Sequence, residues 1–232
     1  AVTVKDGAAT LTSGKDYQVS YANNTNAGTA TVTVTGKGNY TGKVTVKFTI
    51  KKASNTITAS NVTKATSAKA QSFSIGAKVK GGAKLTYKSS SKSVTVDKKG
   101  KVTIAKKFVG QATITVTAAA TKNYNAATKK VTVTVNPASV KLSSVKSAKA
   151  GEMTVKWGKN ATVTGYQVQY STAKNFKSAK TVTVKKAKTT STTIKKLTKG
   201  KKYYVRVRTY QKVSGKTYYS AWSASKNVTI KK

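Results

Sequence analysis

The sequence predicts an all-β protein made of several small β-sandwiches in tandem. Short runs in which polar and apolar residues alternate recur along the chain, as in strands with one buried face. Turn-forming Gly, Asn, Ser and Lys separate these runs at short spacing, and no segment shows a sustained helical period with caps. The 232 residues, with two Trp and 38% hydrophobic content, suffice for two or three small cores rather than one large core.

The clearest alternating run is KVTVKFTIKK, residues 43–52. Val44, Val46 and Phe48 face one side, while the Lys and Thr between them face the other. This pattern is typical of a half-buried antiparallel strand. The same interpretation applies, in chain order, to residues 28–36, 101–105, 111–118, 129–135, 152–157 and 165–171.

Two breaks divide these strands into three units. IKKASNT, residues 50–56, ends the first unit, and VNPAS, residues 135–139, which holds the only proline, ends the second. We therefore expect modules at residues 1–52, 53–136 and 137–232.

The first module contains TLTSGKDYQVSYANNTNAGTATVTVTGKGNYTGKVTVKFTI, residues 10–50. This segment resembles a repeat of surface proteins of Gram-positive gut bacteria. In that family an extra strand precedes the segment that corresponds to AVTVKDG, residues 1–7. The resemblance implies that the first sandwich is incomplete and that the chain is a fragment of a longer protein. The alternative is that Ala1 is a natural mature end.

The second module contains LTYKSSSKSVTVDKKGKVTIAKKFVGQATITVTA, residues 85–118. Its serine-rich stretch, its DKKG turn at residues 97–100 and Gly110 before the next strand are similar to group 2 bacterial immunoglobulin-like domains. We expect Gly100 to take the positive φ that such a hairpin turn requires.

The third module resembles a fibronectin type III domain along its whole length. The matching positions are core residues, which imply a fold and no ligand. They are Trp157, Tyr166, Leu197, Gly200, Tyr203, Val205 and Val207. QKVSGKTYY stands where some members carry an Arg-Gly-Asp loop, so the resemblance does not imply integrin binding.

The chain holds only two arginines among its 45 basic residues, Arg206 and Arg208, and both lie in the third module. If Val205 and Val207 face the core, the arginines face outward. The nearby YSAWSAS resembles half of the Trp-Ser-x-Trp-Ser signature of cytokine-receptor fibronectin domains, where arginines stack on tryptophans. Because a planar guanidinium stacks on an indole better than an ammonium does, we expect Arg206 and Arg208 to flank Trp222 in a structural ladder. The alternative is a patch that binds a sugar or a nucleic-acid base.

The charge balance excludes most catalytic chemistry. Against 45 basic residues stand four acids, Asp6, Asp16, Asp97 and Glu152, so the net charge is +41. These acids fall in turn-like or strand-edge segments far apart in sequence. His and Cys are absent, which removes the usual general base, thiol nucleophile and disulfides. We expect no enzyme activity and no cofactor, and calcium would be repelled.

The lysine excess favours an anionic partner, since solubility alone would be served better by acids. Lysines are densest in residues 185–202. The candidate polyanion-binding residues are Lys185, Lys186, Lys195, Lys196, Lys199, Lys201 and Lys202. The expected partners are teichoic acid, mucin glycan or extracellular nucleic acid. Solubility of a stalk is the alternative reason for the charge.

These features together predict a non-catalytic, structural and adhesive part of a bacterial surface protein. No apolar run reaches the ~20 residues of a membrane helix, so we expect no membrane insertion. The resemblances imply an extracellular protein, secreted or associated with the cell wall of a Gram-positive bacterium. Two other functions stay open: assembly of copies of the chain into a filament or pilus-like structure by strand complementation, and carbohydrate binding through Trp222 and the tyrosines.

Overall fold

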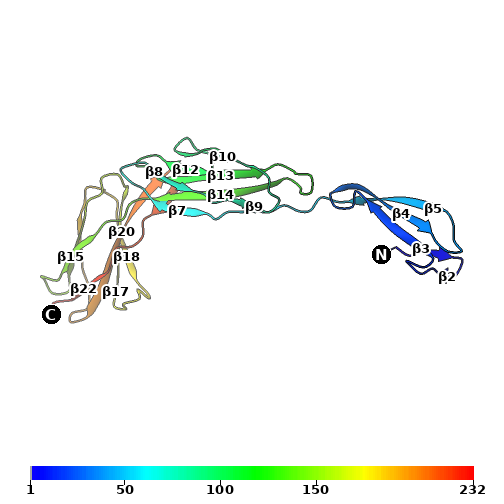
Figure 1. Cartoon of the computed structure of the whole chain (residues 1–232). Coiled ribbons are helices and arrows are strands. Elements are labelled where there is room, and N and C mark those ends of the chain that lie inside the picture. Colours follow the sequence, from blue (N-terminus) through cyan, green and yellow to red (C-terminus); the bar gives the residue numbers. More distant parts are fainter. Residues whose placement is uncertain (1) are drawn as a thin grey trace. The chain divides into compact units, whose positions relative to one another are not determined.

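A computed structural model describes residues 2–232, and within them it holds 22 strands and no helix (Figure 1). The predicted fold class, tandem immunoglobulin-like and fibronectin type III β-sandwiches, is confirmed. The chain divides into two compact units. The first comprises Ala1–Thr58, Ala77–Thr86 and Val116–Lys129, and the second comprises Ala59–Gly76, Tyr87–Thr115 and Lys130–Lys232. The second predicted module is divided between them, so the module boundaries stay predictions.

The N-terminal sheet is an antiparallel meander of three strands in the order β3-β4-β5 (Figure 1). A short hairpin of β1 and β2 precedes it. The strands are β1 (Lys5–Asp6), β2 (Ala9–Thr10), β3 (Tyr17–Ala22), β4 (Gly28–Gly36) and β5 (Lys43–Ile50). Val34 of β4 lies opposite Val19 of β3 and Val44 of β5, so these apolar side chains share one face.

The β5 side of that apolar face is exposed, in contrast to the half-burial expected for residues 43–52. The exposed fractions are 51% for Tyr21, 62% for Val44, 54% for Val46 and 37% for Phe48. Among the described residues no second sheet covers them. The alternation therefore predicted the strand correctly but not its partner layer. We call Tyr21, Val44, Val46 and Phe48 the open face.

The middle strands form two main sheets, in the orders β10-β13-β14-β7 and β11-β12-β8. β7 runs parallel to β14, and β6 pairs separately with β9. The strands are β6 (Ile57–Thr58), β7 (Val62–Ala65), β8 (Gln71–Ser74), β9 (Lys78–Val79), β10 (Leu85–Ser89), β11 (Val94–Val96), β12 (Lys101–Ile104), β13 (Gly110–Ala118) and β14 (Ala127–Asn136). Alternate residues of β12, β13 and β14 are buried, as the period-two pattern predicts.

The turn between β11 and β12 confirms the expectation for Gly100, whose φ is +79°. A Cβ at this position would lie 2.9 Å from Cζ of Tyr87, so glycine is needed for space as well as for conformation. The Asp97 carboxylate accepts hydrogen bonds from the backbone N–H groups of Lys99 (2.8 Å) and Lys101 (2.9 Å). These bonds, that of Lys101 above all, lower the pKa of Asp97.

The C-terminal strands form a sandwich with the sheets β15-β16-β19 and β18-β17-β20-β21, and β22 also pairs with β20 (Figure 1). The strands are β15 (Leu142–Lys146), β16 (Met153–Trp157), β17 (Gly165–Ser171), β18 (Lys180–Val184), β19 (Ser191–Ile194), β20 (Lys202–Val213), β21 (Lys216–Tyr219) and β22 (Lys226–Thr229). We call this the C-terminal sandwich. All of it lies in the second compact unit.

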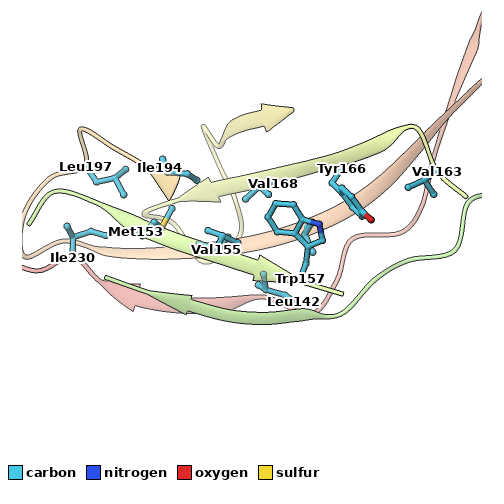
Figure 2. Packing of buried hydrophobic residues seen from close by; sticks show 12 residues of the cluster. Leu142, Met153, Val155, Trp157, Val163, Tyr166, Val168, Ile194, Leu197 and Ile230 are labelled. Atoms are coloured by element: carbon cyan, nitrogen blue, oxygen red, sulfur yellow. The ribbon is translucent and has the colours of Figure 1, made fainter. Parts of the chain in front are cut away.

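The core of the C-terminal sandwich centres on Trp157 and Tyr166, whose ring centroids are 5.3 Å apart (Figure 2). Both side chains are buried, with Val205 and Val207 of β20 in the same cluster. The Tyr166 hydroxyl donates to the carbonyl of Ala187 (2.9 Å), which satisfies its polar end inside the core. Because Val205 and Val207 of β20 point into this core, the alternate residues Arg206 and Arg208 lie on the outer face of the strand.

Candidate functional site

Arg206 and Arg208 flank Trp222 on the outer face of the C-terminal sandwich. The guanidinium carbon of Arg206 lies 4.7 Å from the Trp222 ring centroid, and that of Arg208 lies 4.4 Å from it. Two residues on one side of a strand are about 7 Å apart, which leaves room for one ring between two guanidinium groups. Cations at these distances over an indole are in the range of cation–π contacts.

Two glutamines of the neighbouring strand β17 orient the guanidinium groups. Arg206 Nε donates to Gln169 Oε1 at 2.7 Å. Arg208 donates to Gln167 Oε1 from both Nε (2.9 Å) and Nη2 (2.7 Å). Each glutamine is the direct cross-strand partner of its arginine. Partial burial lowers the pKa of both arginines, but a guanidinium starts so high that both remain cations at neutral pH.

Two further aromatic residues, neither of them predicted as part of the ladder, extend it. Phe176 lies 4.0 Å from the Arg206 guanidinium carbon, and Tyr219 lies 3.9 Å from that of Arg208. The sequence held a signal for Tyr219, because it stands three residues before Trp222, where the signature has its first tryptophan. It held none for Phe176, which lies in the loop between β17 and β18. The ladder comprises Phe176, Arg206, Trp222, Arg208 and Tyr219.

Two serines fix the segment that carries Trp222 against β20. Ser220 donates its N–H to the carbonyl of Thr209 (3.1 Å), and its Oγ accepts from the Thr209 N–H (3.0 Å). In the same way the Ser223 N–H donates to the carbonyl of Val207 (2.8 Å), and Ser223 Oγ accepts from the Val207 N–H (3.1 Å). Each hydroxyl thus takes the place of a backbone acceptor. Between the two serines, Trp222 is held over the arginines.

This geometry favours a structural role for the ladder. The two guanidinium groups lie over the Trp222 ring and leave it little free face for a sugar. The arginines already donate to Gln167 and Gln169. Carbohydrate binding through Trp222 therefore gains no support from the arrangement.

The seven candidate lysines are all exposed, but the structure separates them into two groups. Four of them lie in the connection from β19 to β20 and the fifth is the first residue of β20: Lys195, Lys196, Lys199, Lys201 and Lys202. We call these five the lysine corner. Lys185 and Lys186 follow the far end of β18, about 16 Å along the strand direction from Lys180 at its start. The register of β17 and β18 places Lys180 opposite Tyr170, on the side of the lysine corner.

Few carboxylates balance these cations. Within residues 2–232, the one ion pair joins Lys195 Nζ to Glu152 Oε1 at 3.4 Å. Both side chains reach solvent, so this pair is weak.

In residues 2–232 no three carboxylates lie close enough to hold a metal ion. The described part of the chain also has no helix of the length and apolar character that crossing a membrane requires.

Comparison with known proteins agrees with the geometry of the C-terminal sandwich. Residues 136–226 match the family model of the fibronectin type III domain. This match indicates a structural module of a multidomain protein. No curated protein matches the chain. The resemblances of the first two modules to bacterial repeats stay predictions.

Three solved structures are similar to the chain. The fn3 domain of human contactin 1 is 20% identical, with a TM-score of 0.36, over 41% of this chain and 78% of that chain. A segment with the FN1–FN3 domains of chicken CNTN1 is 17% identical, with a TM-score of 0.37, over 88% and 78%. A segment of titin is 16% identical, with a TM-score of 0.33, over 98% and 87%.

Proposed function

We propose that the chain is a non-catalytic, structural and adhesive part of a secreted or cell-surface protein of a Gram-positive bacterium. Its modules space or tether a functional region, and its lysine-rich surface binds anionic polymers such as teichoic acid, mucin glycan or extracellular nucleic acid. The fibronectin type III match supports the structural part of this proposal. The charge pattern supports the binding part.

The observation that carries the binding part is the near exclusion of acids. There are 45 basic residues and four acidic ones, and the lysine corner places five exposed ammonium groups within eight residues of chain. A polyanion laid over such a surface displaces condensed counterions from several contacts at once. Lysines are point charges without the fixed fork of arginine, so they select little between polymers.

Binding measured over a salt series tests this proposal. For a nucleic acid, log affinity should fall with log salt with a slope near −0.7 to −0.9 per phosphate contacted. Teichoic acid, heparin and DNA should compete for the same surface. No binding to any of the three at about 50 mM salt, where screening is weak, would contradict the proposal.

A matched pair of variants locates the surface. In the first variant the five residues of the lysine corner are replaced by Gln. In the second, five exposed lysines of the middle strands and their loops are replaced: Lys88, Lys92, Lys98, Lys106 and Lys129. Both lose the same charge, but only the first should flatten the salt slope by several contacts. Equal effects would show that net charge, rather than this surface, determines binding.

The open face favours a second candidate function, assembly with another copy of the chain. The N-terminal sheet has two edge strands, β3 and β5, and exposed apolar side chains on both of them. A second copy that covers this side would bury Val44, Val46 and Phe48. Sedimentation over a concentration series should then show association that is lost in Val44→Thr/Val46→Thr, a change that keeps β-branching. A wild-type chain that stays monomeric throughout would exclude this candidate.

A further inference from the structure

A hollow of about 360 Å³ lies in the C-terminal sandwich, between the β17–β18 loop and the lysine corner. We infer that it binds a sugar or polyol unit carrying a phosphate or sulfate ester. The lining residues that carry this inference are Tyr170, Lys177, Lys180, Lys195, Lys196 and Tyr203. We call them the anion pocket. Lys195 and Lys196 also belong to the lysine corner, so the inference rests on the proposed function. It adds which chemical unit of an anionic polymer the pocket binds.

Charge is the first argument for this ligand. Four lysines line the hollow, two from the β17–β18 loop and the start of β18 and two from the segment after β19. Glu152 pairs with Lys195 at 3.4 Å. Among the described residues, Lys177, Lys180 and Lys196 make no ion pair. Several like charges held around one hollow repel one another, and a bound ester anion relieves that repulsion.

The size and chemistry of the walls indicate more than a bare anion. The hollow falls within the range of pockets that hold small organic ligands. Tyr170 and Tyr203 line it, and their ring centroids are 6.2 Å apart with the ring planes at 50°. Three hydroxyl-bearing residues, Thr172, Ser178 and Thr198, also line the hollow. Aromatic surface beside hydroxyl donors suits a sugar or polyol, and the lysines suit its ester group.

The backbone around the hollow is unusual. Ser178, with a φ of +52°, and Lys196, with a φ of +57°, both line it in the left-handed region that non-glycine residues seldom adopt. Such conformations gather at ligand-binding sites. The buried Ser171 shapes the loop, since its Oγ accepts from the Ala173 N–H (3.0 Å) and donates to the Lys177 carbonyl (2.8 Å).

The ladder supports the same loop from outside. Phe176, also left-handed with a φ of +62°, places its ring 4.0 Å from the Arg206 guanidinium carbon. Phe176 directly precedes Lys177 of the anion pocket. The stack on Arg206 therefore holds one rim of the pocket in place. This gives the ladder a role in positioning a binding loop as well as in stabilising the sheet.

The test is an amide NMR titration of the full chain at about 150 mM salt, where weak surface attraction is screened. The probes are glucose 6-phosphate, glucose 6-sulfate, glucose and inorganic phosphate. The two esters should give saturable shifts confined to residues 171–180 and 195–203. Glucose and inorganic phosphate should each bind at least about tenfold more weakly, because each lacks one half of the recognised group.

Two variants with equal charge loss provide the comparison. Lys177→Gln/Lys180→Gln removes two ammonium groups of the pocket that lie outside the lysine corner. Lys185→Gln/Lys186→Gln removes two at the other end of β18. The first pair should weaken ester binding by about tenfold, and the second should leave it unchanged. All four side chains are exposed, so both variants should keep the wild-type spectrum elsewhere.

The outcomes separate this inference from the proposed function. Inorganic phosphate that binds as tightly as the esters, or equal weakening by the two variants, overturns the pocket. Salt-dependent polymer binding without saturable ester shifts also overturns it and leaves the proposed function standing. Saturable ester binding without polymer binding would support the anion pocket and contradict the proposed binding of anionic polymers.

Discussion

Arg206 and Arg208 use two properties of the guanidinium group that lysine lacks. The group is planar, so each arginine contacts an aromatic ring on either side: Phe176 and Trp222 for Arg206, and Trp222 and Tyr219 for Arg208. Its Nε also donates to a glutamine of β17. A lysine would keep the charge but lose both the stacking and the directed hydrogen bonds. This explains why the only two arginines of the chain stand at these positions.

The double change Arg206→Lys/Arg208→Lys should therefore destabilise the C-terminal sandwich by about 1–3 kcal/mol, from the loss of cation–π contacts and charge-assisted hydrogen bonds. Thermal unfolding followed by tryptophan fluorescence measures the change. The control is Lys212→Arg, which changes the same pair of residue types at an exposed position of the same strand. An unchanged melting temperature in the double variant would show that the ladder contributes nothing to stability.

Ser220 and Ser223 offer a second test of single side chains. Each Oγ accepts the N–H of a buried β20 residue, Thr209 or Val207. Ser220→Ala or Ser223→Ala leaves that N–H without its acceptor, at a cost of about 1–3 kcal/mol each. Hydrogen exchange of the Val207 and Thr209 amides should accelerate. Ser225→Ala, at an exposed position of the same segment, should change neither rate.

Among the strands, β17 shows how close packing restricts one residue. A Cβ at Gly165 would lie 2.1 Å from the Val184 carbonyl oxygen and 2.9 Å from Cε1 of Tyr210. Val184 ends β18 and Tyr210 belongs to β20, so any side chain here pushes apart the strands on both sides. The sequence shows a glycine at this position but not which strands surround it.

Gly165→Ala should accordingly cost about 1–3 kcal/mol or more, because the clash involves backbone that cannot turn away. Urea unfolding gives the difference in stability. Gly158→Ala is the matched control, since its nearest neighbours lie at 3.9 Å and its φ is not positive. Its effect should stay within about 0.5 kcal/mol. If the two variants unfold at the same urea concentration, the strands yield more easily than the geometry implies.

The strands themselves were the easiest part to predict. Alternation depends only on which residues face each way, so it located β4, β5, β13 and β17 closely. It could not show that the residues of β5 are exposed, because coverage depends on residues that are distant in sequence. The same alternation predicted only part of the ladder. The outward direction of Arg206 came from the strand pattern, whereas Phe176 reaches it from a loop whose left-handed turn has no sequence signal.

The charge of the whole chain is a property that no single strand reveals. A net charge of +41 with one ion pair in residues 2–232 means that nearly all lysine charges lack a carboxylate partner there. Such self-repulsion opposes the compact state. The same charge that limits stability in free solution therefore favours any state in which a polyanion neutralises it.

Salt should consequently stabilise the fold. Between about 10 mM and about 100 mM NaCl the screening length falls from roughly 30 Å to roughly 10 Å, which removes most repulsion between distant lysines. We expect the melting temperature to rise by several degrees over this range, and to rise less in the variant without the lysine corner. A melting temperature that is flat or falls with NaCl would mean that the charges are too well solvated to oppose folding.

Heparin should give the same rise in melting temperature at micromolar concentration, because a ligand that binds only the folded chain stabilises it in proportion to its occupancy. Sucrose, which acts by exclusion from the surface, should raise wild type and variant equally, and it thereby separates neutralisation of charge from general stabilisation.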